Sequence, residues 1–247
     1  ESTVAASPAA ESGDVLLQVN HLKKYFPVSG NLPGKKKQYV RAVDDVSLQV
    51  RVGRTVGIVG ESGCGKTTMG RTILRLHSIT GGEVLFDGVD IGQLKPRELR
   101  KMRPKMQMIF QDPYSSLSPR MTVGEIIGEA VRQHHIVPPS QYKDYILEVM
   151  EKCGLQPQYF ERYPHEFSGG QRQRICIARA LALKPKLVIC DEPVSALDVS
   201  IQAQIINLLK SLQKRDKIAY IFISHDLSVV EYISDEVGVM YLGSMVE

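Results

Sequence analysis

A glycine-rich loop constrains this chain more than any other feature of its sequence. Residues 60–67 (GESGCGKT) match the pattern GxxxxGK[ST], follow the apolar run 55–59 and open a helical pattern over 66–76. Glycines let several backbone N–H groups point at phosphate oxygens, and the start of the helix adds positive potential there. Lys66 is then expected to contact β- and γ-phosphates, and Thr67 to ligate Mg²⁺. The alternative, a chance glycine-rich turn, is disfavoured by the strand–loop–helix order.

A second apolar run, residues 186–190, ends in two acidic residues. A buried strand would bring Asp191 beside the phosphate loop, where its carboxylate can support Mg²⁺ through the water shell of the ion. Glu192 follows by one residue and points in a different direction, so it can polarise an attacking water as a general base. Without the phosphate loop this signal is weak, because a strand that ends in acids is often an exposed turn.

A third feature is the segment 167–171 (FSGGQ), which precedes the amphipathic run 172–183. A serine hydroxyl and glycine N–H groups at the start of a helix form a second anion site. One nucleotide does not need two such sites far apart in one chain. Two chains arranged head to tail do need them, because each covers the γ-phosphate of the other's nucleotide.

The order of these three motifs resembles the nucleotide-binding domain of ABC transporters. Gln111 resembles the Q-loop residue, Asp198 the D-loop residue and His225 the switch histidine of that family. Longer segments are similar to the ATP-binding subunits of bacterial oligopeptide and dipeptide importers, most of all to the second ("F") type of subunit. These segments are 60–66, 110–122, 162–171 and 191–204.

The resemblance implies ATP and Mg²⁺ as cofactors and gives several residues a role. Gln111 would reach Mg²⁺ and the lytic water, His225 would bind the γ-phosphate and orient Glu192, and Asp198 would order the facing site or cap a helix. An upstream aromatic residue would stack on adenine, with Phe26 favoured by spacing and Tyr25 as the alternative; ordinary packing is the competing interpretation of both. The implied nucleotide-binding set is Gly60, Ser62, Gly63, Cys64, Gly65, Lys66, Thr67 and Thr68 with Ser168, Gly169, Gly170 and Gln171, and the implied metal set is Thr67, Gln111 and Asp191.

The hydropathy pattern predicts an α/β fold. Strands are expected over 14–19, 41–50, 55–59, 82–87, 105–110, 186–190 and 219–223, and the central ones are apolar throughout, as in a mostly parallel sheet buried on both faces. With the resemblance, this indicates a P-loop NTPase (ABC ATPase) core with an N-terminal antiparallel β subdomain and a helical subdomain.

The expected domain organisation is one nucleotide-binding domain over 14–247. Its helical subdomain is expected at about 112–166, with helices over 123–135 and 141–154, and the last residues are expected to form a strand and turn. Residues 1–13, rich in Ala, Ser and Pro, are expected to be a linker or disordered tail. The C-terminal extension found in the family is expected to be absent.

Composition narrows the choice of partners. The net charge of +4 is too small for a dedicated DNA binder, the four cysteines show no zinc spacing, and no apolar run reaches the roughly 18–20 residues of a membrane span. The resemblance implies an ATP-hydrolysing subunit that powers import of di- or oligopeptides, or of a related solute such as nickel or glutathione. Its expected partners are a second ABC ATPase subunit or half, two transmembrane permease subunits and, indirectly, an extracytoplasmic solute-binding protein, with no nucleic acid. Its expected location is peripheral, on the cytoplasmic face of the bacterial inner membrane.

Two other classes stay open. A soluble ABC ATPase that acts on nucleic acid or ribosomes is disfavoured by the modest charge and by the lack of coiled coils or zinc modules. A catalytically weak regulatory ATP-binding subunit is disfavoured by intact Glu192, His225 and residues 168–171.

Overall fold

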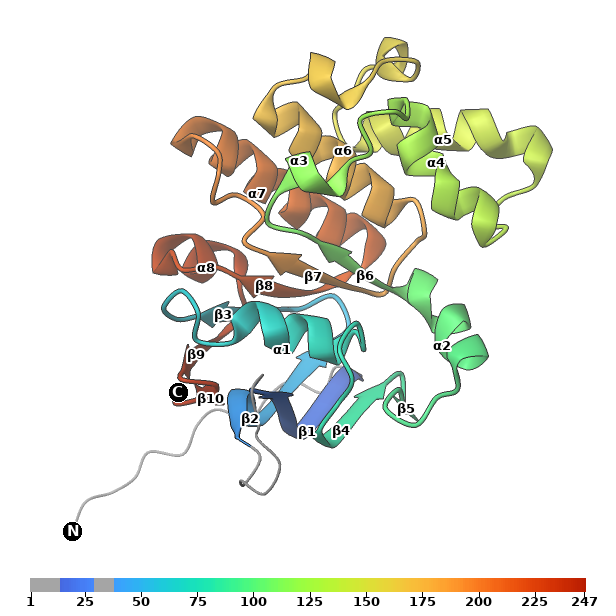
Figure 1. The fold of residues 1–247 in the computed structure, drawn as a ribbon. Helices are drawn as coiled ribbons and strands as arrows, with labels where there is room; N and C mark the ends of the chain where they lie inside the picture. The colour runs from blue at the N-terminus through green and yellow to red at the C-terminus, as the bar shows by residue number, and fades with distance from the viewer. Residues whose placement is uncertain (1–13, 29–37) are drawn as a thin grey trace.

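A six-stranded sheet forms the centre of the computed structural model, which describes residues 14–28 and 38–247 (Figure 1). Its strand order is β10-β9-β3-β8-β7-β6, and β9, β3, β8, β7 and β6 run parallel. Only the short β10 pairs antiparallel, with β9. The bounds are β3 Thr55–Val59, β6 Met106–Ile109, β7 Leu187–Asp191, β8 Ala219–Ile223, β9 Glu236–Tyr241 and β10 Ser244–Met245.

The central strands are apolar throughout because two separate cores cover the two faces of the sheet. In β8, Tyr220 and Phe222 belong to the core beneath α6 (Gly169–Leu181), α7 (Val199–Asp216) and α8 (Leu227–Ile233). Ile221 and Ile223 belong to the opposite core, which contains α1 (Lys66–Ile73). This arrangement confirms the predicted parallel sheet, and the strands β3 and β8 have the predicted bounds.

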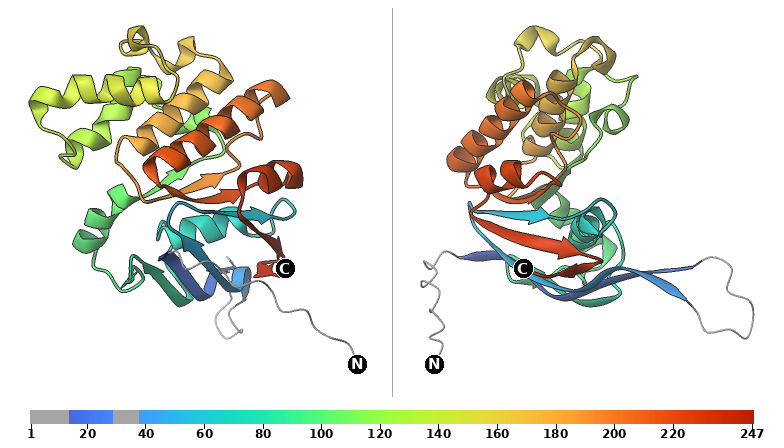
Figure 2. Two further views of the ribbon diagram at one scale, coloured as in Figure 1. Left: turned by 180° about the vertical axis from the view of Figure 1, so that it is seen from behind. Right: turned by 90° about the vertical axis from the view of Figure 1, so that its left-hand side faces the viewer.

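The second sheet is antiparallel, with the order β2-β1-β4-β5, and it covers the other side of α1 (Figure 2). Its strands are β1 Val15–Pro27, β2 Tyr39–Arg51, β4 Gly81–Phe86 and β5 Val89–Asp90. The prediction that the first strand ends at residue 19 was wrong, because β1 continues through a bulge between Val19 and Leu22. His21, at the bulge, has a φ of 50°, which interrupts the alternation that marks a strand in the sequence.

Short helices precede and follow β6 in the chain. Helices α4 (Val123–Gln133) and α5 (Tyr142–Lys152) match the two predicted helices, although each ends two residues earlier. Thr122 begins α4 with a capping box that it shares with Glu125. The remaining helices are α2 Pro96–Met102, η1 Arg103–Lys105, α3 Pro113–Ser116, η2 Pro139–Gln141, η3 Pro157–Tyr159 and η4 Pro164–Glu166.

The expected division of the chain into segments stays a prediction. The linker or tail predicted at 1–13 lies outside the described residues. The domain bounds, including the helical subdomain at about 112–166, remain predictions. Within the described part of the chain, no helix combines the length and apolar character needed to span a bilayer.

Candidate active site

The phosphate loop lies at the carboxyl edge of the parallel sheet, between β3 and α1, and borders a cavity of about 590 Å³. Two of its glycines are required by close backbone contacts. A Cβ on Gly60 would lie 2.2 Å from the carbonyl oxygen of Met240, and one on Gly65 would lie 2.1 Å from that of Ala42. Gly65 also has a φ of 110°, which side chains rarely adopt. The loop is therefore pressed between two strands that are distant in sequence.

Lys66 points its ammonium group into the curve of this loop. Its side chain donates to the carbonyl oxygens of Gly60, at 2.6 Å, and Glu61, at 2.8 Å, although the residue is only 5% exposed. The thiol of Cys64 lies 3.8 Å from the same nitrogen. Because these contacts are with uncharged groups, the buried cation gives the cavity a site for an anion.

A hydroxyl and a carboxylate meet on the other side of Lys66. The Thr67 hydroxyl donates to the Asp191 carboxylate at 2.8 Å, and Asp191 is 1% exposed. Burial raises the pKa of Asp191, while the Thr67 hydrogen bond opposes that shift. Oxygen ligands of this kind are the ones that Mg²⁺ prefers, so these two residues fit the predicted metal role.

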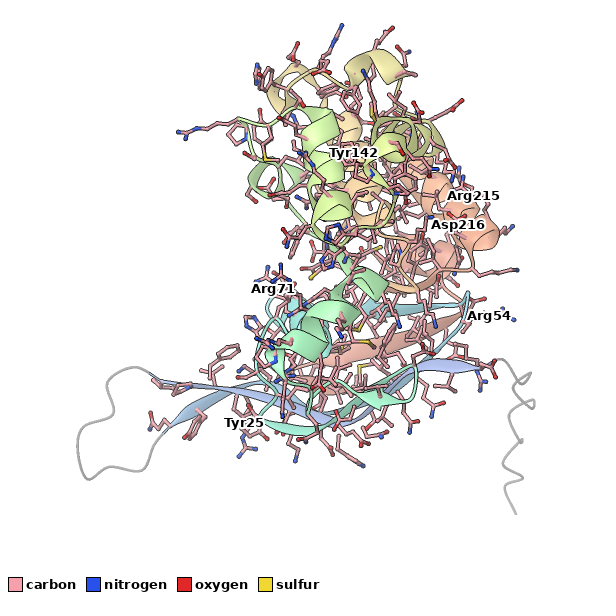
Figure 3. All side chains as sticks on the ribbon, turned by 90° about the vertical axis from the view of Figure 1, so that its right-hand side faces the viewer. Tyr25, Arg54, Arg71, Tyr142, Arg215 and Asp216 are labelled. Atoms are coloured by element: carbon pink, nitrogen blue, oxygen red, sulfur yellow. The ribbon has the colours of Figure 1, made fainter. Side chains whose placement is uncertain are left out.

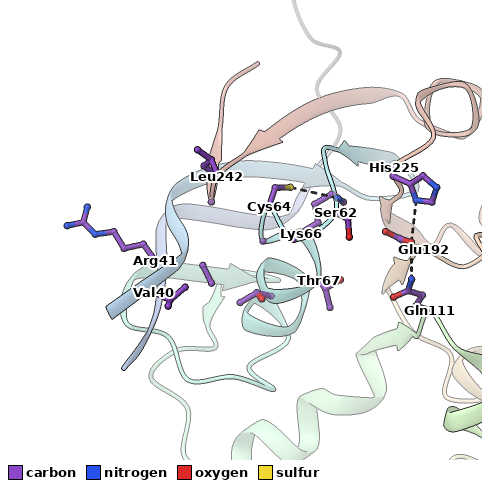
Figure 4. Close-up of a pocket in the computed structure, with 15 residues that line it drawn as sticks. Val40, Arg41, Ser62, Cys64, Lys66, Thr67, Gln111, Glu192, His225 and Leu242 are labelled. Atoms are coloured by element: carbon purple, nitrogen blue, oxygen red, sulfur yellow. Dashed lines mark hydrogen bonds and ion pairs between the residues drawn. The ribbon is translucent and has the colours of Figure 1, made fainter. Parts of the chain in front are cut away.

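Three polar side chains converge beside this pair, each from the carboxyl end of a different strand (Figure 4). Glu192 follows β7 with a left-handed φ of 46°, a backbone conformation that sets the direction of its side chain apart from that of Asp191. The Gln111 amide, just beyond β6, donates to the Glu192 carboxylate at 3.0 Å. His225, just beyond β8, places Nδ1 3.4 Å from the same oxygen. The strand order β8-β7-β6 is what makes these three residues neighbours.

The second anion motif lies outside this cavity. The Ser168 hydroxyl accepts the backbone N–H of Gln171 at 3.4 Å, and the Gln171 side chain accepts the N–H of Ser168 at 3.0 Å, so the two residues cap α6. Asp198 caps α7 in the same way by accepting the N–H of Ile201 at 3.0 Å, and these hydrogen bonds lower its pKa. The predicted helix-cap role of Asp198 is confirmed.

Neither predicted aromatic residue lines the cavity. Tyr25 lies in β1 of the antiparallel sheet (Figure 3). Its hydroxyl donates to Asp44, and its ring lies 5.7 Å from the guanidinium of Arg41. The Phe26 ring instead makes an edge contact with His77, at 5.6 Å between ring centroids. Tyr25 therefore contacts a residue that lines the cavity, whereas Phe26 contacts His77, which does not line it.

Sequence reasoning missed the cavity wall that adjoins the phosphate loop. It is formed by residues of β2 and of the turn between β9 and β10, and no local motif marks these residues. They are Val40, Arg41, Ala42, Leu242 and Gly243.

Comparison with known proteins agrees with this geometry. Residues 43–195 match the model of the ABC transporter family. This chain belongs to the ABC transporter family. The oligopeptide transport ATP-binding protein AppF of Bacillus subtilis (strain 168) is 54% identical over 239 residues, which cover 96% of this chain and 73% of AppF. OppF of the same strain, also an oligopeptide transport ATP-binding protein, is 53% identical over 234 residues, which cover 94% of this chain and 74% of OppF.

A solved structure matches over almost the whole ABC cassette. It is the dimeric structure of a post-hydrolysis state of the ATP-binding cassette MJ0796 bound to ADP and Pi. The TM-score is 0.82 at 28% sequence identity, with 94% of this chain and 97% of that chain covered. This likeness confirms the predicted ABC ATPase fold, including the mostly parallel sheet and the antiparallel β subdomain.

Within this ABC cassette, the predicted site residues fall into two groups. One group lines the cavity: Ser62, Gly63, Cys64, Gly65, Lys66, Thr67, Thr68, Gln111, Glu192 and His225. Asp191 joins it through Thr67, and Gly60 through Lys66. The residues that do not line it are Tyr25, Phe26, Ser168, Gly169, Gly170, Gln171 and Asp198.

Proposed function

We propose that this ABC cassette binds ATP with Mg²⁺ in the described cavity and hydrolyses it to power peptide import through a membrane transporter. The observation that carries the proposal is the convergence of Gln111, Glu192 and His225 beside the buried ammonium group of Lys66. A carboxylate that can take a proton from water, next to a fixed cation that can hold a phosphate, is the arrangement that phosphoryl transfer to water requires.

Nucleotide binding rests on the loop and on Lys66. The loop amides and the start of α1 supply positive potential for the phosphates, and Lys66 supplies a full charge. Thr67 and Asp191, with Gln111, are the residues that would hold Mg²⁺. The bound ion would neutralise the charge that develops on the phosphate oxygens during transfer.

Glu192 acts as the general base in the proposed reaction. It accepts a proton from water while the water oxygen forms a bond to the γ-phosphorus and the bond to the ADP oxygen breaks. The Gln111 amide and the His225 imidazole lie on the same carboxylate oxygen, and they fix the direction in which Glu192 points.

Hydrolysis requires a second cassette in this proposal. Ser168 and Gln171 cap their own helix and lie outside the cavity of their own chain, which leaves them available to another cassette's nucleotide. The dimeric state described for the similar cassette MJ0796 supports this arrangement. Asp198, at the start of α7, would order the facing site across the same dimer.

Peptides are the proposed cargo because the relatives AppF and OppF are named as oligopeptide transport proteins. The other partners would be two transmembrane permease subunits and, through them, a solute-binding protein outside the membrane. The cassette would then lie at the cytoplasmic face of the membrane.

The test is reconstitution of the full-length chain with its candidate permease and second ATPase subunits in proteoliposomes. ATP hydrolysis that drives uptake of a labelled oligopeptide, and that depends on Glu192, is the expected result. Hydrolysis that responds to nucleic acid or ribosomes but drives no uptake would favour a soluble ABC ATPase. Nucleotide binding without turnover in the assembled complex would favour a regulatory subunit.

A further inference from the structure

A short helix, α3, begins just after Gln111. Helix α3 is capped by Asp112, whose carboxylate accepts the N–H groups of Tyr114 at 2.8 Å and Ser115 at 3.3 Å. The Ser116 hydroxyl donates to the Asp112 carbonyl oxygen at 2.6 Å. A cap that satisfies the first amides of such a short helix holds it together as a unit. A displacement of Gln111 would therefore move α3 as one body.

Two arginines of α6 hold α3 in place. The guanidinium carbon of Arg172 lies 3.9 Å from the centroid of the Tyr114 ring, and Arg179 donates to the carbonyl oxygen of Ser116. The two arginines are two helical turns apart, so they lie on the same side of α6. Arg172 is only 8% exposed, whereas Tyr114 is 68% exposed and keeps one ring face against the guanidinium.

The same guanidinium also holds the chain in front of Ser168. Arg172 Nε donates to the Pro164 carbonyl oxygen at 2.8 Å, and a terminal nitrogen donates to that of His165 at 3.5 Å. Arg172 itself comes directly after Gln171 in α6. One buried side chain therefore touches α3, which follows Gln111, and the segment η4, which leads to Ser168.

We propose that the contact between Arg172 and Tyr114 couples the two ATP sites of the assembled dimer. This inference rests on the proposed function, in which Gln111 serves the cavity of its own chain and Ser168 serves the cavity of the partner. A shift of Gln111 against Glu192 moves α3 and its tyrosine ring. Movement of the ring then moves the Arg172 side chain that stacks on it. Arg172 in turn moves both ends of the segment that presents Ser168. Tyr114 and Arg172 are positioning residues, because they act through Gln111 and Ser168.

The experiment measures ATP hydrolysis by the full-length chain assembled with its partner subunits, over a range of ATP concentrations. Tyr114→Ala and Tyr114→Leu remove the aromatic ring, and Tyr114→Phe keeps it. Because Tyr114 is exposed, these changes leave the cores intact. The matched control is Tyr232→Ala, which removes an exposed tyrosine of α8 with its own stacked cation, Lys210 at 4.1 Å.

Loss of the ring is expected to lower the Hill coefficient towards 1 and to lower kcat by about 3- to 30-fold, the range expected when coupling between sites is perturbed. ATP affinity of the unassembled chain is expected to change by less than about 2-fold, because Tyr114 does not line the cavity. Tyr114→Phe and Tyr232→Ala are expected to behave like the wild type.

Several results would overturn the coupling role. One is an unchanged Hill coefficient and kcat in Tyr114→Ala and Tyr114→Leu, and another is a Tyr114→Phe variant as impaired as Tyr114→Ala. Release of the permease subunits by Tyr114→Ala, measured by co-purification, would assign the ring to a subunit contact instead. A wild-type Hill coefficient of 1 would exclude coupling while leaving the proposed ATPase function intact. Absence of ATP hydrolysis in the wild-type assembly would instead refute the proposed function.

Discussion

The phosphate-loop cavity and the signature segment 168–171 are both proposed anion sites at the start of a helix, but they differ in what surrounds them. In the cavity, side chains that follow two strands contact the Glu192 carboxylate, which follows a third strand, and the Lys66 cation is buried. The signature segment satisfies its own polar groups within one helical turn, and the capping contacts between Ser168 and Gln171 are exposed to solvent. The fold of one chain brings together all the groups of the cavity described here. The signature segment instead lies at the surface of that chain.

This difference separates nucleotide binding from hydrolysis. The groups proposed to hold phosphates all come from one chain, so a single cassette is expected to bind ATP. Turnover is expected to need the exposed segment of a second cassette. Variants that affect one of these properties without the other are therefore the sharpest tests of the comparison.

The largest effect is expected from Glu192→Gln. The amide keeps the shape of the side chain but cannot accept the proton of water, so turnover is expected to fall by about 100- to 10 000-fold, the usual contribution of a general base. ATP binding should persist, and the ATP-bound variant should accumulate as a dimer in size-exclusion chromatography. Glu231→Gln, which removes an exposed carboxylate of α8, is the matched control. Normal turnover in Glu192→Gln would rule out Glu192 as the base.

Ser168→Arg is expected to separate the two sites. A long side chain at the start of α6 would obstruct the approach to the partner's nucleotide, and turnover of the assembled transporter is expected to fall by about 100- to 1000-fold, as when a transition-state donor is lost. ATP affinity of the unassembled chain, measured by titration, should stay unchanged. Ser211→Arg, at an exposed serine of α7, tests for a general effect of added charge. If the variant itself binds ATP poorly, Ser168 belongs to the cavity of its own chain and the comparison is wrong.

Lys66→Ala addresses the cavity alone. Removal of the buried ammonium group is expected to weaken ATP binding by about 10- to 100-fold, the value of a charge-assisted hydrogen bond to phosphate. Calorimetric titration of the single chain measures this directly, with Lys214→Ala of α7 as the control for a lost surface charge. ATP affinity equal to that of the wild type would mean that phosphate does not reach the curve of the loop.

The sequence was most informative where a site is encoded by consecutive residues. The apolar runs that became β3 and β8 have the predicted bounds, because strands buried on both faces leave no alternation to misread. Residues 60–67 also indicate phosphate binding by themselves, because glycine, lysine and threonine occur there at a fixed spacing. The fold class could be predicted for the same reason.

The features that the sequence could not predict depend on contacts between distant segments of the chain. The contact of Gln111 and His225 with Glu192 requires that β6, β7 and β8 lie side by side in the sheet, and no local pattern in the sequence states which strands pair. The wall formed by Ala42 and Gly243 faces the loop only because two sheets meet there, so no local pattern marks it. The contact between Arg172 and Tyr114 likewise joins a helix to a segment far from it in sequence.

The smallest effect is expected from Tyr25 and Phe26, the two residues that the sequence offers as alternatives for contact with adenine. Tyr25 does not line the cavity but contacts Arg41, which does, so Tyr25→Ala is expected to raise the ATP concentration for half-maximal binding by about 2- to 5-fold, the value of an exposed cation–π contact. Tyr25→Phe keeps the ring while removing the hydrogen bond to Asp44, and it should retain most of the affinity. Phe26→Ala is the matched control, because Phe26 packs against His77. A larger loss from Phe26→Ala than from Tyr25→Ala would place the adenine near Phe26 and His77 instead of near Tyr25 and Arg41.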